Sequence, residues 1–97
     1  MLILKTLARG GEMHGFEIAN SIQQISEDVL RVEEGSLYPA LQRMLLRGWA
    51  TAEWGVTAGN RRARYYKLTK AGRKELEAEL SQFQRVNQAI IRVIQTA

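Results

Sequence analysis

Two segments of the chain hold side chains that suit contact with nucleic acid. Residues 61–74 carry seven of the 14 lysines and arginines, and no acidic residue interrupts them. Residues 35–47 include Ser36, Gln42 and Arg43, whose hydroxyl, amide and guanidinium groups can bond phosphates or base edges. A helix in the major groove beside a cationic strand pair on the phosphates would combine the two segments. Together they indicate a DNA-binding surface.

The apolar spacing predicts the elements that would position those side chains. Helices are expected over residues 2–8, 15–24, 35–47 and 70–94, and strands over residues 49–54 and 62–68. Thr69 is expected to cap the last helix, and Pro39 to lie in the first turn of the third, which would begin close to Ser36. This order predicts a mainly α fold with a small β-hairpin. It is a winged helix-turn-helix over residues 1–69 with a long dimerisation helix over residues 70–97, forming one compact unit.

The last expected helix carries a heptad pattern with spacings of four and three residues. The seam positions are Leu76, Leu80, Phe83, Asn87, Ile90 and Ile94. A helix of this length exceeds what a 97-residue core can cover, so a partner helix is the simpler explanation. Asn87, the polar member of the seam, is expected to fix the register of pairing at some cost in stability. We therefore predict a homodimer.

Composition limits the functional classes to which the protein can belong. A chain of 97 residues with a formal net charge of +4 supports one domain and favours an anionic partner. The chain has no cysteine, which excludes disulfides and thiolate zinc sites and favours a cytoplasmic location. The apolar start, residues 1–4, is far too short for a signal sequence or a membrane span, so no membrane partner is expected.

The sequence does not indicate an enzyme. His14 is the only histidine and Asp28 the only aspartate, and the nine glutamates are scattered or lie on helix surfaces. A lone histidine before a helix is more often a cap or packing residue than a catalyst, and no second histidine or cysteine offers a metal partner. No nucleophile, base and orienting residue can be assembled. We expect no catalytic residue, no metal site and no cofactor.

Seven short blocks in order along nearly the whole chain carry a family resemblance. They are Leu2–Ala8, Met13–Ala19, Gly35–Leu41, Gly48–Trp49, Ala52–Trp54, Arg61–Leu68 and Thr69–Arg73. In these blocks the chain resembles the PadR family of bacterial transcriptional regulators. The single helix after the wing is similar to the compact branch of that family. The resemblance implies a homodimeric repressor of double-stranded DNA, whose two-fold symmetry predicts an inverted-repeat operator with half-sites roughly 34 Å apart.

The resemblance also implies roles for individual residues. The third helix would be the recognition helix, and the wing would reach the DNA backbone. The residues implied to lie near DNA are Ser36, Tyr38, Pro39, Gln42, Arg43, Arg61, Arg62 and Arg64. Within this set Gln42 can pair with adenine and Arg43 with guanine, while Ser36 is better placed for a phosphate. The last helix would pack on its mate and on the first helix, which adds Leu4 to the interface.

Compact relatives can bind small aromatic or cationic compounds at the dimer interface, so the resemblance implies a small hydrophobic or aromatic effector. In this chain, however, Trp49 and Trp54 fall by the wing, and Phe83 is the only aromatic residue of the last helix. The chain also departs from the family pattern at Leu45 and Leu46, where acidic and polar residues are usual, and at Ala50, where a branched aliphatic is usual. The two leucines indicate an additional contact surface.

Two other functions remain open from the residues. A winged-helix module could bind a protein partner through Leu45, Leu46 and the apolar seam, and its binding would be insensitive to salt. A non-specific nucleic-acid binder would show steep salt dependence without sequence discrimination. Neither alternative explains the polar helix face and the basic hairpin together.

Overall fold

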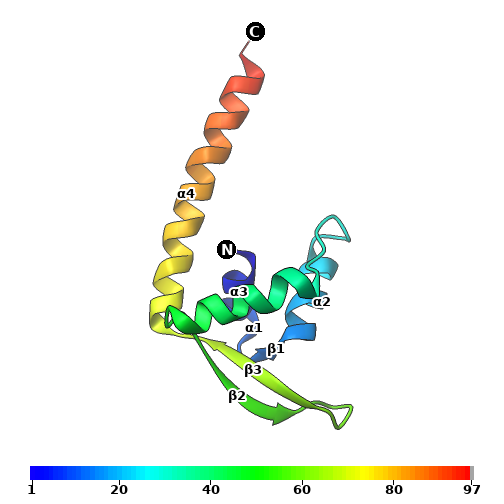
Figure 1. The fold of residues 1–97 in the computed structure, drawn as a ribbon. Helices are drawn as coiled ribbons and strands as arrows, with labels where there is room; N and C mark the ends of the chain where they lie inside the picture. Colours follow the sequence, from blue (N-terminus) through cyan, green and yellow to red (C-terminus); the bar gives the residue numbers. More distant parts are fainter. Residues whose placement is uncertain (97) are drawn as a thin grey trace.

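A computed structural model describes residues 1–96 of the chain, and Figure 1 shows its arrangement. The elements in order are α1 (Leu2–Gly10), β1 (Met13–His14), α2 (Gly15–Ile25), α3 (Glu34–Leu46), β2 (Ala50–Val56), β3 (Arg62–Leu68) and α4 (Lys70–Gln95). The prediction of a mainly α winged helix-turn-helix with a hairpin and a long last helix is confirmed. Residue 97, the end of the expected dimerisation segment, lies outside the described residues.

One apolar core joins the helices to the sheet. Its buried side chains come from all four helices and from both strands of the hairpin: Leu4, Leu7, Ile18, Ile22, Leu37, Leu41, Met44, Ala50, Tyr66, Leu68 and Leu76. Within each of the first three helices these residues are three or four positions apart, so each helix turns one stripe inward. No helix among residues 1–96 has the length and apolar character needed to cross a membrane.

The helix starts follow from local hydrogen bonds. The backbone N–H of Glu17 donates to His14 Nδ1 at 3.4 Å, and the N–H of His14 donates to Glu17 Oε1 at 3.1 Å, which forms a capping box at the start of α2. The hydroxyl oxygen of Thr69 accepts from the Gly72 N–H at 3.0 Å and donates to the Gly48 carbonyl at 2.6 Å. The interpretation of His14 as a cap and the prediction of the Thr69 cap are both confirmed.

The third helix begins one to two residues before its expected start. Helix α3 begins at Glu34, so Pro39 lies in the second turn instead of the first. At that position the missing N–H of proline leaves the carbonyl of Gly35 without its helical donor. A local bond between the N–H of Ser36 and the carbonyl of Glu33, at 3.0 Å, already tightens this first turn.

The sheet is antiparallel with strand order β1-β3-β2. In the β2–β3 hairpin Ala50 faces Leu68 and Val56 faces Arg62. The short strand β1, which the sequence pattern did not predict, pairs with β3 through Met13 and His14. Because His14 is also the cap of α2, this pairing holds the start of α2 against the hairpin. Alternation in a strand predicts opposite sides for Tyr65 and Tyr66, and only Tyr66 is in the core.

Helix α4 is attached to the core only by its first turns. Gly72 and Leu76 are buried there, and a Cβ atom at Gly72 would overlap the carbonyl oxygen of Trp49. From residue 81 to residue 96 every residue is exposed. Figure 1 shows that α4 therefore projects well past the rest of the molecule. With α4 included, the molecule measures 57 Å along its longest axis.

Candidate nucleic-acid interface

The outward face of α3 carries the helix residues that the sequence analysis selected. Leu37, Leu41 and Met44 turn into the core, which leaves the other side of the helix to solvent. The five selected residues of this helix are all exposed: Ser36, Tyr38, Pro39, Gln42 and Arg43. They therefore occupy a surface that a DNA groove could reach without disturbing the core.

A cleft of about 430 Å³ brings part of this face together with the wing. It lies between α3, the start of α2 and the β2–β3 hairpin, and Figure 1 shows these elements side by side. Its lining residues are His14, Gly15, Phe16, Tyr38, Gln42, Trp54, Arg62, Ala63, Arg64 and Tyr66. Gln42, which can read a base edge, and Arg62, which can neutralise a phosphate, thus share one cleft although they are 20 positions apart in the sequence.

Aromatic rings hold the two arginines of the cleft. The guanidinium carbon of Arg62 lies 4.5 Å from the centre of the Trp54 ring, and that of Arg64 lies 5.8 Å from the same ring and 5.9 Å from the Tyr66 ring. These are cation–π distances. Arg64 is half-buried, and its Nε atom is buried without a hydrogen-bond partner among the described residues. An anionic oxygen in the cleft would supply that missing partner.

The wing arginines carry uncompensated charge. Within residues 1–96 neither Arg61, Arg62 nor Arg64 lies within 4.0 Å of a carboxylate oxygen. Arg61 does not line the cleft and instead closes the hairpin loop, where its carbonyl accepts from the Thr57 N–H at 2.8 Å and its own N–H donates to the Thr57 hydroxyl at 3.2 Å. The hairpin therefore presents one arginine at its loop and two along strand β3, on the side that lines the cleft.

Arg43 lies apart from the other selected residues. It lines a separate hollow of about 170 Å³ between α1, α3 and α4, together with Arg47, Trp49 and Glu79. The structure therefore places Gln42 toward the wing and Arg43 toward the base of α4, although they are neighbours in sequence. Gln42 and Arg43 can therefore contact different parts of a ligand.

Sequence reasoning missed the aromatic part of the cleft. Phe16 is 73% exposed and Trp54 is 60% exposed, and both line it. An exposed phenylalanine at the start of a helix, and a tryptophan on the outward side of a strand opposite Arg64, were available signals. Large apolar side chains of this kind, left in solvent next to cations, mark a contact surface.

Comparison with known proteins decides the family. The model of the PadR-like family of transcriptional regulators matches residues 3–78, which is most of the chain. This chain belongs to that family. Its members are transcriptional regulators and not enzymes, so the candidate interface above lies on a PadR-like regulator. A comparison with curated proteins gives no match.

Solved structures share the PadR-like fold over most of the chain. A transcriptional regulator from Clostridium thermocellum has 23% identity and a TM-score of 0.87, with 97% of this chain and 90% of that chain covered. A PadR family regulator from Clostridium difficile has 25% identity and a TM-score of 0.75, with 95% of each chain covered. PadR from Bacillus subtilis, solved in complex with operator DNA, has 25% identity and a TM-score of 0.70, with 81% of this chain and 43% of that chain covered.

The seam residues of this PadR-like chain fall into two groups. Phe83 and Ile90 are each 51% exposed, Ile94 is 75% exposed, and Asn87 is exposed as well. Leu80 is partly buried against the core.

Two residues of the expected dimer interface are buried in the single chain. Leu4 and Leu76, at 2% and 6% exposure, hold α1 and α4 to the core. Their place in a dimer interface stays a prediction. The free part of the seam begins after Leu76.

Proposed function

We propose that this chain is a sequence-specific DNA-binding regulator that acts as a homodimeric repressor on an inverted-repeat operator. The observation that carries the proposal is the cleft in which Gln42 and Tyr38 of α3 meet Arg62 and Arg64 of the wing. Base-reading and phosphate-binding groups are needed at one place for specific binding. The solved complex of Bacillus subtilis PadR with operator DNA supports the same use of this fold.

In the proposed complex α3 lies in the major groove. Gln42 bonds an adenine edge, Arg43 a guanine edge, and Ser36, near the start of the helix, a phosphate. Tyr38 and Pro39 lie beside the DNA strand that enters next to α3. Arg61, Arg62 and Arg64 follow the backbone beside the groove. If about six basic side chains neutralise phosphates, the logarithm of affinity should fall with the logarithm of salt concentration with a slope of about −5.

Dimerisation is proposed through α4. Its apolar seam positions beyond the core, Phe83, Ile90 and Ile94, are exposed on a single chain, which is costly unless a partner covers them. Two-fold symmetry of such a dimer requires an inverted repeat, and occupancy of a promoter by it would block transcription. A cytoplasmic location follows for a protein that works on chromosomal DNA.

Regulation by a small hydrophobic or aromatic effector is part of the proposal. Trp54 lines the DNA-facing cleft and Trp49 the hollow near Arg43, so neither reports on the α4 seam. Binding of an effector to the cleft itself would quench Trp54 fluorescence, while an effector at the seam would act without that signal.

Selection from fragmented genomic DNA tests the proposal. The chain is mixed with the fragments at near-physiological salt, and the retained duplexes are sequenced. Enrichment of an inverted repeat that is lost with Gln42→Ala, and kept with Gln24→Ala on the exposed side of α2, supports it. Retention without a shared motif points to a non-specific binder. If no DNA is retained, the protein-binding alternative becomes the favoured function. The observation that supports this alternative is Leu46, which is 78% exposed.

A further inference from the structure

Helix α3 carries two polar rows, one on either side of its outward face. Successive residues of an α-helix point about 100° apart, so the neighbours Gln42 and Arg43 diverge by that angle. Tyr38, four residues before Gln42, shares its row, which lines the cleft beside the wing. Arg47, four residues after Arg43, shares the other row, and both arginines line the hollow between α1, α3 and α4. The second row therefore lies on the side of α3 away from the cleft.

Arg47 directly follows α3 and continues its helical geometry. Its φ of −86° and ψ of −2° lie in the right-handed helical region, and its N–H donates to the Arg43 carbonyl at 3.0 Å. The side chain is exposed, and its guanidinium carbon lies 5.1 Å from the centre of the Trp49 ring, which is a cation–π distance. Because Trp49 is half-buried, its ring holds the cation in place at the C-terminal end of α3.

Each of the two tryptophans of the chain thus lies against an arginine, on different sides of α3. Trp54 is 4.5 Å from the guanidinium of Arg62 on the wing, beside the cleft. Trp49 is at the hollow on the other side. An aromatic ring orders a cation in both places, so both cations lose less side-chain entropy when they bind an anion.

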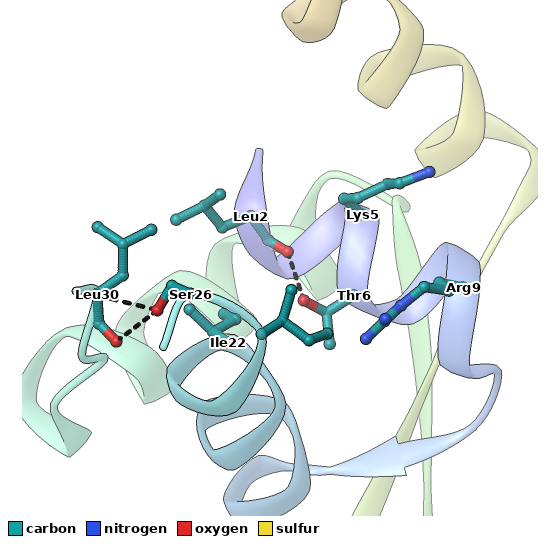
Figure 2. Close-up of a pocket in the computed structure, with 8 residues that line it drawn as sticks. Leu2, Lys5, Thr6, Arg9, Ile22, Ser26 and Leu30 are labelled. Carbon is teal, nitrogen blue, oxygen red and sulfur yellow. Dashed lines mark hydrogen bonds between the residues drawn. The ribbon is translucent and has the colours of Figure 1, made fainter. Parts of the chain in front are cut away.

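The charge of Arg47 has no acidic partner within residues 1–96. No carboxylate oxygen lies within 4.0 Å of its guanidinium, not even that of Glu79, which also lines the hollow. Arg9 gives the contrasting case. It lines the groove between α1 and α2 that Figure 2 shows, and its Nη2 donates to the Ser21 hydroxyl at 2.9 Å. The guanidinium of Arg47, in contrast, is available to an external anion.

The width of the DNA major groove decides what the second row can reach. The groove is ~12 Å wide, and an α-helix with its side chains is ~10–12 Å across, so a helix in the groove lies close to both walls. Those walls are the two phosphate backbones of the duplex. Arg47 is turned ~40° further to the side than Arg43. Arg43 is therefore directed at base edges, and Arg47 at the wall.

We propose that Arg47 binds a phosphate of the DNA strand opposite to the strand that the wing follows, and that Trp49 positions it there. This inference rests on the proposed function, because it needs α3 in the major groove. In homeodomains, too, the C-terminal end of the recognition helix contacts the backbone, so this end of a helix is within reach of a phosphate.

Contacts on both backbones set the orientation of α3. Phosphate contacts carry no sequence information but fix the register and orientation of a protein on the duplex. With Arg62 and Arg64 on one backbone alone, α3 would still be able to turn about that contact. Arg47 on the other backbone stops this turn, and so determines which base pairs Gln42 and Arg43 face.

Arg47→Ala tests the contact. It should weaken binding to the selected operator and to a random duplex alike, by about 5-fold at ~0.15 M salt, and reduce the salt slope by about 0.9. Arg47→Lys keeps the charge and should keep the slope. Arg31→Ala is the matched control, because Arg31 is exposed and lines neither the cleft nor the hollow. Equal affinities and slopes for Arg47→Ala and Arg31→Ala would overturn the proposal.

Methylphosphonate substitution assigns the strand. Each methylphosphonate replaces one charged phosphate of the operator by a neutral group, so it should weaken binding only where a cation contacts that phosphate. A phosphate that Arg47 contacts should matter for the wild-type chain and no longer matter for Arg47→Ala. The phosphates identified in this way should lie on one strand of the half-site, and those identified with Arg62→Ala on the complementary strand. Identification of the same strand by both variants overturns the proposal.

Trp49→Leu tests the positioning of Arg47. It should weaken binding by roughly 2- to 5-fold, the size of one cation–π contact, while the salt slope stays the same. In a chain that already carries Arg47→Ala it should have no further effect. Trp49→Phe keeps a ring and should restore most of the affinity. An equal loss with and without Arg47 would show that Trp49 acts through the fold, and would reject its positioning role.

The outcomes separate this inference from the proposed function. Sequence-specific binding that responds equally to Arg47→Ala and Arg31→Ala rejects the Arg47 contact and leaves the regulator intact. Binding without sequence preference that weakens with Arg47→Ala alone keeps the contact and rejects the proposed specificity. A wild-type chain that retains no duplex rejects both.

Discussion

The guanidinium of Arg62 lies 4.5 Å from the centre of the Trp54 ring, across the two strands of the wing. Arg64 approaches the same ring at 5.8 Å, so one tryptophan orders two cations on the inner side of the hairpin. An arginine that is already ordered loses less side-chain entropy when it binds a phosphate. The contribution of Trp54 to DNA binding should therefore be positional and not ionic.

Trp54→Ala should weaken DNA binding by roughly 2- to 5-fold, the size of one exposed cation–π contact. Because no charge is removed, the dependence of affinity on salt should keep its slope. Titration of a labelled operator at three salt concentrations measures both quantities. Val56→Ala, an exposed wing residue with no ring beside an arginine, is the control. A changed salt slope would show that the substitution displaces the arginines altogether.

Arg62→Ala should act differently. Loss of one phosphate contact should weaken binding to all sequences alike and reduce the salt slope by about one unit. Separate titrations of the operator and of a random duplex, each at several salt concentrations, measure both quantities. If Arg62→Ala altered the preference between sequences while the slope stayed constant, Arg62 would be a base reader.

Gln42→Ala should lower affinity only for operators that keep the base pair it reads, by about 1–3 kcal/mol. A library of half-sites with each position varied identifies that base pair. Arg43→Ala is the informative comparison, because Arg43 lies in a different hollow, beside Arg47 and Trp49. The two variants should lose preference at different base pairs. Loss at one shared position would contradict the separation seen in the structure.

Thr69→Ala should destabilise the fold by about 1–2 kcal/mol. It removes the cap of α4, and it also removes the donor to the Gly48 carbonyl. Thr69→Ser keeps the hydroxyl and should restore most of the loss. Denaturant unfolding at several protein concentrations separates this effect from dimerisation. Equal stability of the alanine and serine variants would exclude the hydroxyl as the cause.

Glu75 gives a pH dependence. A side-chain hydrogen bond with Glu79 raises the pKa of Glu75 above its ordinary value. The folded chain then holds this proton more tightly than the unfolded chain, so the stabilising contribution is present at low pH and is lost as the pH rises through the raised pKa. Glu75→Gln should therefore raise the melting temperature near pH 7 and have a smaller effect near pH 4, with Glu77→Gln as the control. A rise in the melting temperature near pH 4 alone would contradict this assignment of the Glu75 pKa shift.

The elements with strong local signals were predictable from sequence. Thr69 before a long helix and His14 before a short one are caps whose partners lie three residues away, so no tertiary information is needed. The start of α3 was misplaced because proline is most favourable in a first turn. In this chain the packing of Leu37, Leu41 and Met44 keeps the helix although Pro39 lies further in.

The cleft was only half predictable. Its polar members follow from charge and from the type of side chain, but Phe16 and Tyr66 come from segments 50 residues apart in the chain. Their meeting depends on β1, a strand of two residues that is too short for any alternation pattern. The position of Arg43 was also not predictable, because its distance from the wing depends on the orientation of α3 about its own axis. Tertiary packing sets that rotation.

A Cβ atom at Gly72 would overlap the carbonyl oxygen of Trp49, so α4 leaves the body along a path that needs a glycine at this position. Because more than 20 residues follow it, a tilt of ~5° at this point moves the far end of the helix by ~3 Å. In the proposed dimer that displacement changes the separation of the two recognition helices. A single substitution at this contact could thus give a regulator with a new preferred operator spacing, while every residue that faces DNA stays the same.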